Sequence, residues 1–380
     1  MKIPFARPML SDIEKSAVSD VLNGTVLTHG PNCANFEKNF ANYIGAVHAV
    51  TTSNCTTALH LGLTAIGVDV SDEVIVPAMT HVASAHAVEH CGAKPVFVDV
   101  DKVTGCIDPD LIEEKITSRT KAIVVVHFVG LPCDMGRITE IAHKHNIAVV
   151  EDAATALGST YDGKKAGGLG DIGCFSFYPT KHITSMEGGM LTTDSERLAT
   201  LVRSRRAFGY DRGLQDRRLP GIYDIVDLGW NYRMSEGHAA VGRVQLTKID
   251  EFLQKRRQNA EMLREELLDV SEIYLHPFKH EKSESSWYCV NIQVTKKSLK
   301  TRDQMIQFLN AQGVGTSVHY PVPLPMSTYY AAKYPSDCYS YPEAKKIAEN
   351  TISLPCGPHM NPSDVDFVVA SVKSALTSKH

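Results

Sequence analysis

The sequence predicts an α/β fold in which a large domain with a mostly parallel central sheet is followed by a smaller α+β domain. Two observations carry this prediction. Between residues 34 and 151, short apolar segments alternate with amphipathic helical segments, which is typical of βαβ units and parallel sheets. After about residue 232 the alternation gives way to a long helical stretch and then to isolated elements. We therefore expect a large domain over residues 1–245 and a small C-terminal domain over residues 246–380.

In the large domain, the first expected helix covers residues 34–45, because Phe36, Phe40 and Ile44 share one face and Gly45 ends it. A β-branched strand over 47–52 then leads through residues 53–57 into a helical segment from Ala58. Further strands are expected over 73–76, 95–100, 121–126 and 147–151, and further helices over 82–91 and 137–145. Ligands on parallel sheets bind beyond the carboxyl ends of the strands, so functional residues are expected there.

The C-terminal part begins with an expected helix over about 232–268, whose apolar face includes Val241, Leu246 and Phe252. A strand is expected over 287–294, a helix over 302–312, and a last helix after Pro362. Residues 278–286 are the most polar stretch, and we expect them to form a surface loop.

The composition excludes several classes of protein. The 380 residues carry a formal net charge of -4, so no binding to nucleic acid or to an anionic membrane is expected. No apolar run approaches the roughly 20 residues of a membrane span, and the first residues lack the long apolar segment of a signal peptide, so neither is expected. The 9 cysteines are odd in number and form no CxxC pair, so we expect neither a disulfide framework nor a metal site. A cytoplasmic location is the simplest expectation.

Two strand-to-loop junctions carry groups suited to ligand binding. At residues 53–57 a helix begins, and its N–H groups together with the hydroxyls of Thr56 and Thr57 suit a phosphate. An ordinary N-cap explains the same residues. Glu151 and Asp152 end an apolar strand, where a partly desolvated carboxylate needs a cation. A helix-capping Asp is the alternative there.

Two further segments complete the candidates. The loop after a strand-like segment at 171–177 holds Lys181, and a lysine in an apolar site can serve as a Schiff-base nucleophile. Most lysines are solvated surface residues, however. Gly188 and Gly189 permit close approach of the backbone. Asn231, at the expected start of the long helix, could bind an anion or orient that helix.

Taken together, these groups match the needs of pyridoxal phosphate (PLP). Its aldehyde requires a lysine, its pyridine nitrogen requires a carboxylate, and its phosphate requires a helix end. Pyridoxal phosphate is therefore the cofactor that the residues predict.

The same residues resemble the DegT/DnrJ/EryC1/StrS family of PLP-dependent nucleotide-sugar aminotransferases. The matching segments are residues 53–61, 77–81, 151–154, 175–177, Lys181 with 187–189, 231–236 and 319–321. The resemblance covers nearly the whole chain, and the order and spacing of the segments make it specific. It implies the fold-type-I architecture of aspartate aminotransferase.

The resemblance also implies roles for individual residues. The catalytic pair would be Lys181, as the Schiff-base residue, and Asp152, which would pair with the pyridine nitrogen. The residues implied in cofactor binding are Thr56, Thr57 and Ser176 at the phosphate, His81 on the ring, Thr155, Asp152 and Lys181, and Asn231. Asn231 would reach the cofactor phosphate of a neighbouring subunit, which implies a homodimer with shared sites. His319 and Tyr320 would lie near the sugar nucleotide.

The implied reaction moves an amino group from an amino acid, L-glutamate by resemblance, through pyridoxamine phosphate to a nucleotide-linked keto-deoxy sugar. Its product would serve surface polysaccharide, such as lipopolysaccharide, or a natural product. One alternative is a sugar dehydratase of the same family, whose members carry His at the position of Lys181. The other is a non-catalytic cofactor-binding protein. Lys181 argues against both, while the sugar, the nucleotide and the aminated carbon stay open.

The chain departs from the family pattern at positions around the expected site. They are Cys55 for a frequent Gly, His81 for an aromatic residue, Thr155 for a longer polar residue, and Met186 for a Gly. None of these changes removes a group that the chemistry requires.

Overall fold

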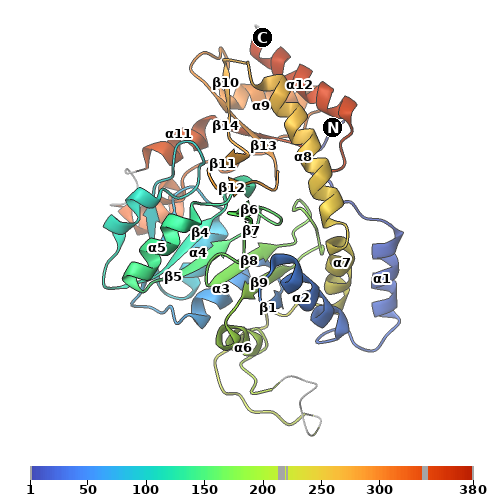
Figure 1. The fold of residues 1–380 in the computed structure, drawn as a ribbon, viewed down its shortest axis with the longest axis vertical. Helices are drawn as coiled ribbons and strands as arrows, with labels where there is room; N and C mark the ends of the chain where they lie inside the picture. The colour runs from blue at the N-terminus through green and yellow to red at the C-terminus, as the bar shows by residue number, and fades with distance from the viewer. Residues whose placement is uncertain (1, 213–218, 220, 336–340, 379–380) are drawn as a thin grey trace.

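The computed structural model describes residues 2–212, 219, 221–335 and 341–378 (Figure 1). Its main sheet has seven strands in the order β1-β9-β8-β5-β4-β2-β3. The neighbours from β8 to β3 pair in parallel, and β9 runs antiparallel to β8 and β1. The strands are β1 His48–Thr52, β2 Glu73–Pro77, β3 Lys94–Val98, β4 Thr120–Val126, β5 Ala148–Asp152, β8 Ile172–Ser176 and β9 Gly189–Thr193. The predicted α/β fold with a mostly parallel sheet is confirmed.

The central strands are apolar throughout because helices and loops cover both faces of the sheet. All of β2 is buried, and so is β4 from Ala122 onward. The helices around this sheet are α2 Pro31–Ile44, α3 Cys55–Ala65, α4 Val82–His90, α5 Met135–His145 and α6 Glu196–Arg205. Each of the helices expected between residues 34 and 145 is present, with ends shifted by a few residues.

A second, antiparallel sheet in the order β10-β13-β14 lies in the C-terminal part. Its strands are β10 Ile273–Leu275, β13 Val290–Val294 and β14 Thr351–Leu354, and the later helices are α9 Arg302–Gln312, α10 Thr328–Lys333, α11 Pro342–Asn350 and α12 Pro362–Thr377. Figure 1 shows α9 and α12 beside this sheet. The sheet has its own buried cluster, to which Ile3 also contributes. The expected division into two domains between residues 245 and 246 stays a prediction. The packing of Ile3 shows that the N-terminal segment contributes to the core of the C-terminal part.

Two expectations for the C-terminal half are wrong in detail. The stretch 232–268 forms two helices, α7 Glu236–Leu246 and α8 Ile249–Leu267, and Ser235 caps the first of them. Residues 278–286 are no simple surface loop, because they form strands β11 Lys279–His280 and β12 Ser283–Glu284. Strand β12 pairs with β6 Thr160–Tyr161, which pairs in turn with β7 Lys164–Lys165. This pairing buries Ser283, Ser285 and Ser286, so polarity alone did not reveal their position.

Among the residues that the structure describes, no helix combines the length and the apolar character needed to cross a bilayer.

Helix α1, Asp12–Leu22, is held against α7 and α8 by the buried carboxylate of Glu14. Lys248 Nζ donates to Glu14 Oε1 at 2.6 Å, and Gln245 Nε2 donates to the same oxygen at 2.7 Å. Burial raises the pKa of Glu14, but the hydrogen bonds from Lys248, Ser11 and Gln245 outweigh it and lower the pKa from 4.5 to about 2. The ionised form therefore stabilises the fold.

We expect Glu14→Gln to lower the free energy of unfolding by about 2 kcal/mol at neutral pH, because buried donors lose a charged acceptor. A carboxylate with a lowered pKa contributes its full stability above its unfolded pKa and loses it as pH falls through its folded pKa. The difference from wild type should therefore shrink as pH falls from about 4.5 toward 2. Urea denaturation across this pH range measures both effects. Glu261→Gln is the control, because Glu261 pairs with Arg257 at the surface and should cost less than about 0.5 kcal/mol. Equal losses in the two variants would contradict the assignment.

Candidate active site

A cavity of about 370 Å³ opens where the strands of the main sheet end, and it collects most of the predicted site residues. The predicted residues that line it are Thr56, His81, Asp152, Thr155, Ser176, Lys181, His319 and Tyr320. They come from segments that follow β1, β2, β5 and β8, together with one segment of the C-terminal part. Thr57 and Asn231 do not line the cavity.

The first turn of α3 faces the cavity, and the helix begins earlier than expected, at Cys55. Asn54 caps it, because Asn54 Oδ1 accepts from the backbone N–H of Thr57 at 2.9 Å. The hydroxyl of Thr57 donates back to Asn54 O at 2.8 Å, so this side chain completes the cap and does not reach the cavity. The ordinary N-cap is therefore present, and anion binding by this helix end stays a prediction. Thr56 supplies the cavity-facing hydroxyl.

The carboxylate of Asp152 lies at the end of β5 and is only 5% exposed. Ser84 on α4 donates its hydroxyl to Asp152 Oδ2 at 2.7 Å, and the N–H of Ala154 donates to Oδ1 at 3.1 Å. Sequence reasoning missed Ser84, because a serine inside a helix carries no signal until the fold brings it to a partner far along the chain. Thr155 lines the same wall, but its hydroxyl donates to His127 O at 3.1 Å.

Lys181 lies on the loop after β8, where its N–H donates to Tyr178 O at 2.9 Å. Its Nζ is 5.1 Å from the centre of the Tyr288 ring, and the Tyr288 hydroxyl is 3.4 Å from Thr180 Oγ1. Tyr288 is a second residue that sequence reasoning missed. Ser176, at the end of β8, accepts from the N–H of Tyr178 at 3.3 Å, which leaves its own hydrogen available to a ligand.

The backbone at the two glycines lies close to a neighbouring segment, as expected. A Cβ at Gly189 would lie 2.3 Å from Asn54 O, so only glycine lets β9 lie against the start of α3. Met186, which precedes this segment, has a φ of 69° in the left-handed region. The glycine that the family commonly has there would adopt this conformation without strain.

His81, His319 and Tyr320 also line the cavity. His81 caps α4 through Nδ1, and its ring lies 6.1 Å from that of Tyr320. Burial, followed by the charges of Lys181 and His81, lowers the pKa of His319 to about 3. Ser353 Oγ donates to Asn291 Oδ1 at 2.6 Å, so His319 Nδ1 donates to Ser353 Oγ at 2.8 Å. His319 is thus neutral and keeps an unprotonated Nε2.

The N-terminal segment also reaches this region. The ring of Phe5 lies 6.3 Å from Tyr288 and 5.8 Å from His319. No feature of the sequence placed it there.

Asn231 lies outside the cavity and is exposed. Its Oδ1 accepts from Arg233 Nε at 2.9 Å, and its backbone forms a bridge with Ala207. The expectation that the long helix starts at Asn231 is wrong, because α7 starts at Glu236 with Ser235 as its cap.

Comparison with known proteins identifies relatives of this chain. The model of the DegT/DnrJ/EryC1/StrS aminotransferase family matches residues 8–373. GDP-perosamine synthase of Caulobacter vibrioides is 38% identical over 99% of this chain and 98% of its own length. The spore coat polysaccharide biosynthesis protein SpsC of Bacillus subtilis is 37% identical over 98% of this chain and 97% of its own length.

A solved structure of similar sequence also has a similar fold. Spr1654 from Streptococcus pneumoniae, in its PLP form, superposes with a TM-score of 0.92 and 32% identity, covering 99% of this chain and 98% of its own. The resemblance noted in the sequence is confirmed: the chain belongs to the DegT/DnrJ/EryC1/StrS aminotransferase family.

Proposed function

We propose that the protein is a PLP-dependent aminotransferase that moves an amino group from L-glutamate to a nucleotide-linked keto-deoxy sugar. The observation that carries this proposal is the single cavity that holds Lys181, Asp152 and the first turn of α3. The relationship to GDP-perosamine synthase supports a nucleotide sugar as the acceptor. The product would be an amino sugar for surface polysaccharide or a natural product.

The residues around the cavity fit the cofactor. They supply one primary amine, one buried carboxylate and one helix N-terminus, which are the groups that its aldehyde, ring nitrogen and phosphate require. In this assignment Thr56, Ser176 and the N–H groups of α3 hold the phosphate, with Thr57 fixing the turn that presents them. His81 covers the ring, and Thr155 contributes to the wall behind it.

When bound, pyridoxal phosphate supplies an aldehyde that receives the amino group and a ring that withdraws electrons from the donor Cα. Lys181 Nζ acts as the base toward the Cα proton and afterwards as the acid that returns it. Asp152 holds the proton at the ring nitrogen. Glutamate is released as its keto acid, and the keto sugar is released carrying the amino group. The amino group that the donor loses is therefore the one that the sugar gains. His319 and Tyr320 border the space assigned to the sugar nucleotide.

A partner subunit completes the site in this proposal. Asn231 is exposed and its side chain points to no cavity-lining residue of its own chain. The same region exposes apolar side chains, with Ile225 65% and Leu228 75% exposed. Exposed apolar residues in such a group are typical of a protein interface. A two-fold dimer would carry the Asn231 of each subunit to the phosphate of the other.

The test of the activity is a transfer assay. Purified protein with pyridoxal phosphate and ¹⁵N-labelled glutamate is offered a panel of nucleotide-linked 4-keto-6-deoxy and 3-keto sugars. We expect ¹⁵N in one sugar product, and we expect borohydride to fix the cofactor on Lys181, as read by peptide mapping. Lys181→Ala should abolish both results, because no other described residue of the cavity offers an amine. Label on another lysine, or transfer by Lys181→Ala, would contradict the assignment.

Asp152→Asn should fold normally, because the amide has nearly the same shape and keeps an oxygen for Ser84. It loses the charge that holds the proton at the ring nitrogen, so kcat should fall on the order of 1000-fold. The measurement is kcat at saturating pyridoxal phosphate, with circular dichroism as the check on folding. Ser84→Ala, which removes one donor from Asp152, should cost roughly tenfold. Near-normal turnover of Asp152→Asn would show that another acid holds this proton.

The shared site is tested by mixing two variants. Lys181→Ala and Asn231→Ala subunits should each be nearly inactive alone. In a mixed dimer one site carries both defects and the other carries neither, so activity should partly return. Mass spectrometry of differently tagged subunits monitors the exchange. If exchange occurs without recovery, Asn231 serves its own chain.

A further inference from the structure

Glu151 is a second buried acid beside Asp152, and the chemistry proposed above leaves it without a role. Successive residues of a strand point to opposite faces, so Asp152 faces the cavity and Glu151 faces away from it. The Glu151 side chain is 0% exposed. A carboxylate so placed costs several kcal/mol unless charge-assisted hydrogen bonds replace its lost hydration.

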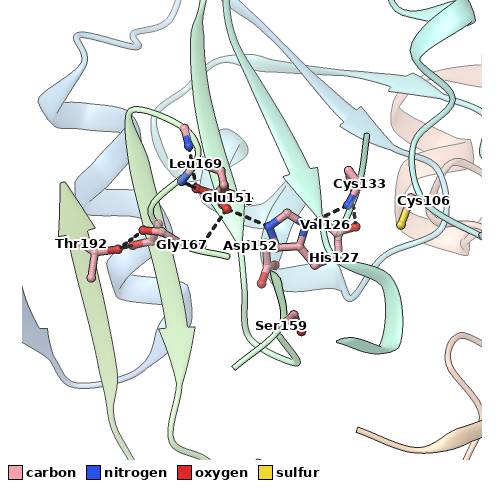
Figure 2. Close-up of polar contacts among 12 residues, drawn as sticks. Cys106, Val126, His127, Cys133, Glu151, Asp152, Ser159, Gly167, Leu169 and Thr192 are labelled. Carbon is pink, nitrogen blue, oxygen red and sulfur yellow. Dashed lines mark hydrogen bonds and ion pairs between the residues drawn. The ribbon is translucent and has the colours of Figure 1, made fainter. Parts of the chain in front are cut away.

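Four N–H donors surround the carboxylate, and Figure 2 labels three of the residues that supply them, His127, Gly167 and Leu169. His127 Nε2 lies 2.8 Å from Glu151 Oε2, and the N–H of Gly167 donates to the same oxygen at 2.7 Å. The N–H groups of Leu169 and Gly170 each donate to Oε1 at 2.7 Å. Each of these neighbours can donate a hydrogen bond to a carboxylate oxygen.

The tautomer of His127 follows from its other contact. The N–H of Cys133 donates to His127 Nδ1 at 3.2 Å, so Nδ1 carries no proton and Nε2 donates to Glu151. The backbone of His127 is tied to the segment that holds the catalytic acid. Its N–H donates to Asp152 O at 3.2 Å, and its carbonyl accepts from Thr155 Oγ1 at 3.1 Å.

The other donors belong to the turn at residues 167–170, which leads into β8. The carbonyl of Gly167 accepts from Thr192 Oγ1 at 2.5 Å, so this turn is also fixed to β9. Strand β8 ends at Ser176, directly before the loop that carries Lys181. One carboxylate thus connects the segment after β4, the end of β5 and the start of β8.

We propose that Glu151, together with His127, is a positioning residue that fixes the carboxylate of Asp152 relative to Lys181. The inference rests on the proposed function, because it assigns a purpose to the position of these two groups. Glu151 does not line the cavity described above and is not a catalytic residue. It fixes the relative positions of three segments through charged hydrogen bonds. A shift of any one segment breaks at least one of these hydrogen bonds.

The test compares matched variants with wild type. Glu151→Gln keeps the shape but turns an amide NH₂ toward two of the four donors. His127→Ala removes the side-chain donor, whereas His127→Gln keeps an N–H at a similar reach. Glu113→Gln is the control, because Glu113 accepts from His145 Nε2 at 2.9 Å in a surface pair that does not line the cavity. The readouts are melting temperature, the dissociation constant of pyridoxal phosphate from the apo-protein, and kcat at saturating cofactor.

In Glu151→Gln we expect kcat to fall on the order of 100-fold, because small displacements of reacting groups cost that much. The dissociation constant for the cofactor should rise roughly tenfold, because the Asp152 contact weakens. His127→Ala should behave like Glu151→Gln, and His127→Gln should recover most of the loss. Glu113→Gln should match wild type in all three readouts.

Two results would overturn the inference. One is a Glu151→Gln protein with lowered melting temperature but wild-type cofactor affinity and kcat, which would make the pair a stabilising contact only. The other is equal behaviour of His127→Ala and His127→Gln, and this comparison decides the matter if Glu151→Gln does not fold. If wild type itself transfers no amino group, the proposed function is wrong. That outcome is distinct from a wild type that transfers the amino group and variants that match it in kcat and cofactor affinity, which would overturn only the inference about Glu151.

Discussion

The burial of two consecutive carboxylates at the end of β5 is the constraint around which the site is built. Strand geometry sends Glu151 and Asp152 to opposite faces, and neither can lose its hydration without replacement donors. Ser84 and the N–H of Ala154 serve Asp152, while His127 and the turn at 167–170 serve Glu151. Helix α4, strand β4 and strand β8 must therefore lie where they do.

Much of this arrangement can be predicted from the sequence, because the signals are local. The buried strands are continuous apolar runs; Asp152 ends one of them, and Lys181 lies on the loop that follows another. The ends of parallel strands meet at one edge, so residues far apart in sequence could be assigned to a common site. The likeness in motif order then identified the family, and the match over residues 8–373 confirms it.

Prediction from the sequence failed where the role of a residue depends on its neighbours in three dimensions. Thr57 has the residue type for phosphate binding, yet its hydroxyl completes the cap of α3. Ser84, Tyr288 and Phe5 carry no distinctive pattern, and they reach the site only through the packing of distant segments. The serines at 283–286 appear as a polar loop in sequence but become buried, because β12 pairs with β6. Met186 keeps a left-handed backbone at a cost of roughly 1–2 kcal/mol relative to glycine.

The contacts of the first residues have a consequence for how the chain folds during synthesis. Ile3 pairs with Val314 and lies in the same core as α12, while Phe5 lies beside His319. These partners leave the ribosome long after the N-terminal segment does, and closing so large a loop is slow. The large sheet can assemble first, since its strands all precede Asp194. The part of the cavity that His319 lines, beside Phe5, is therefore completed only after residue 319 has been synthesised.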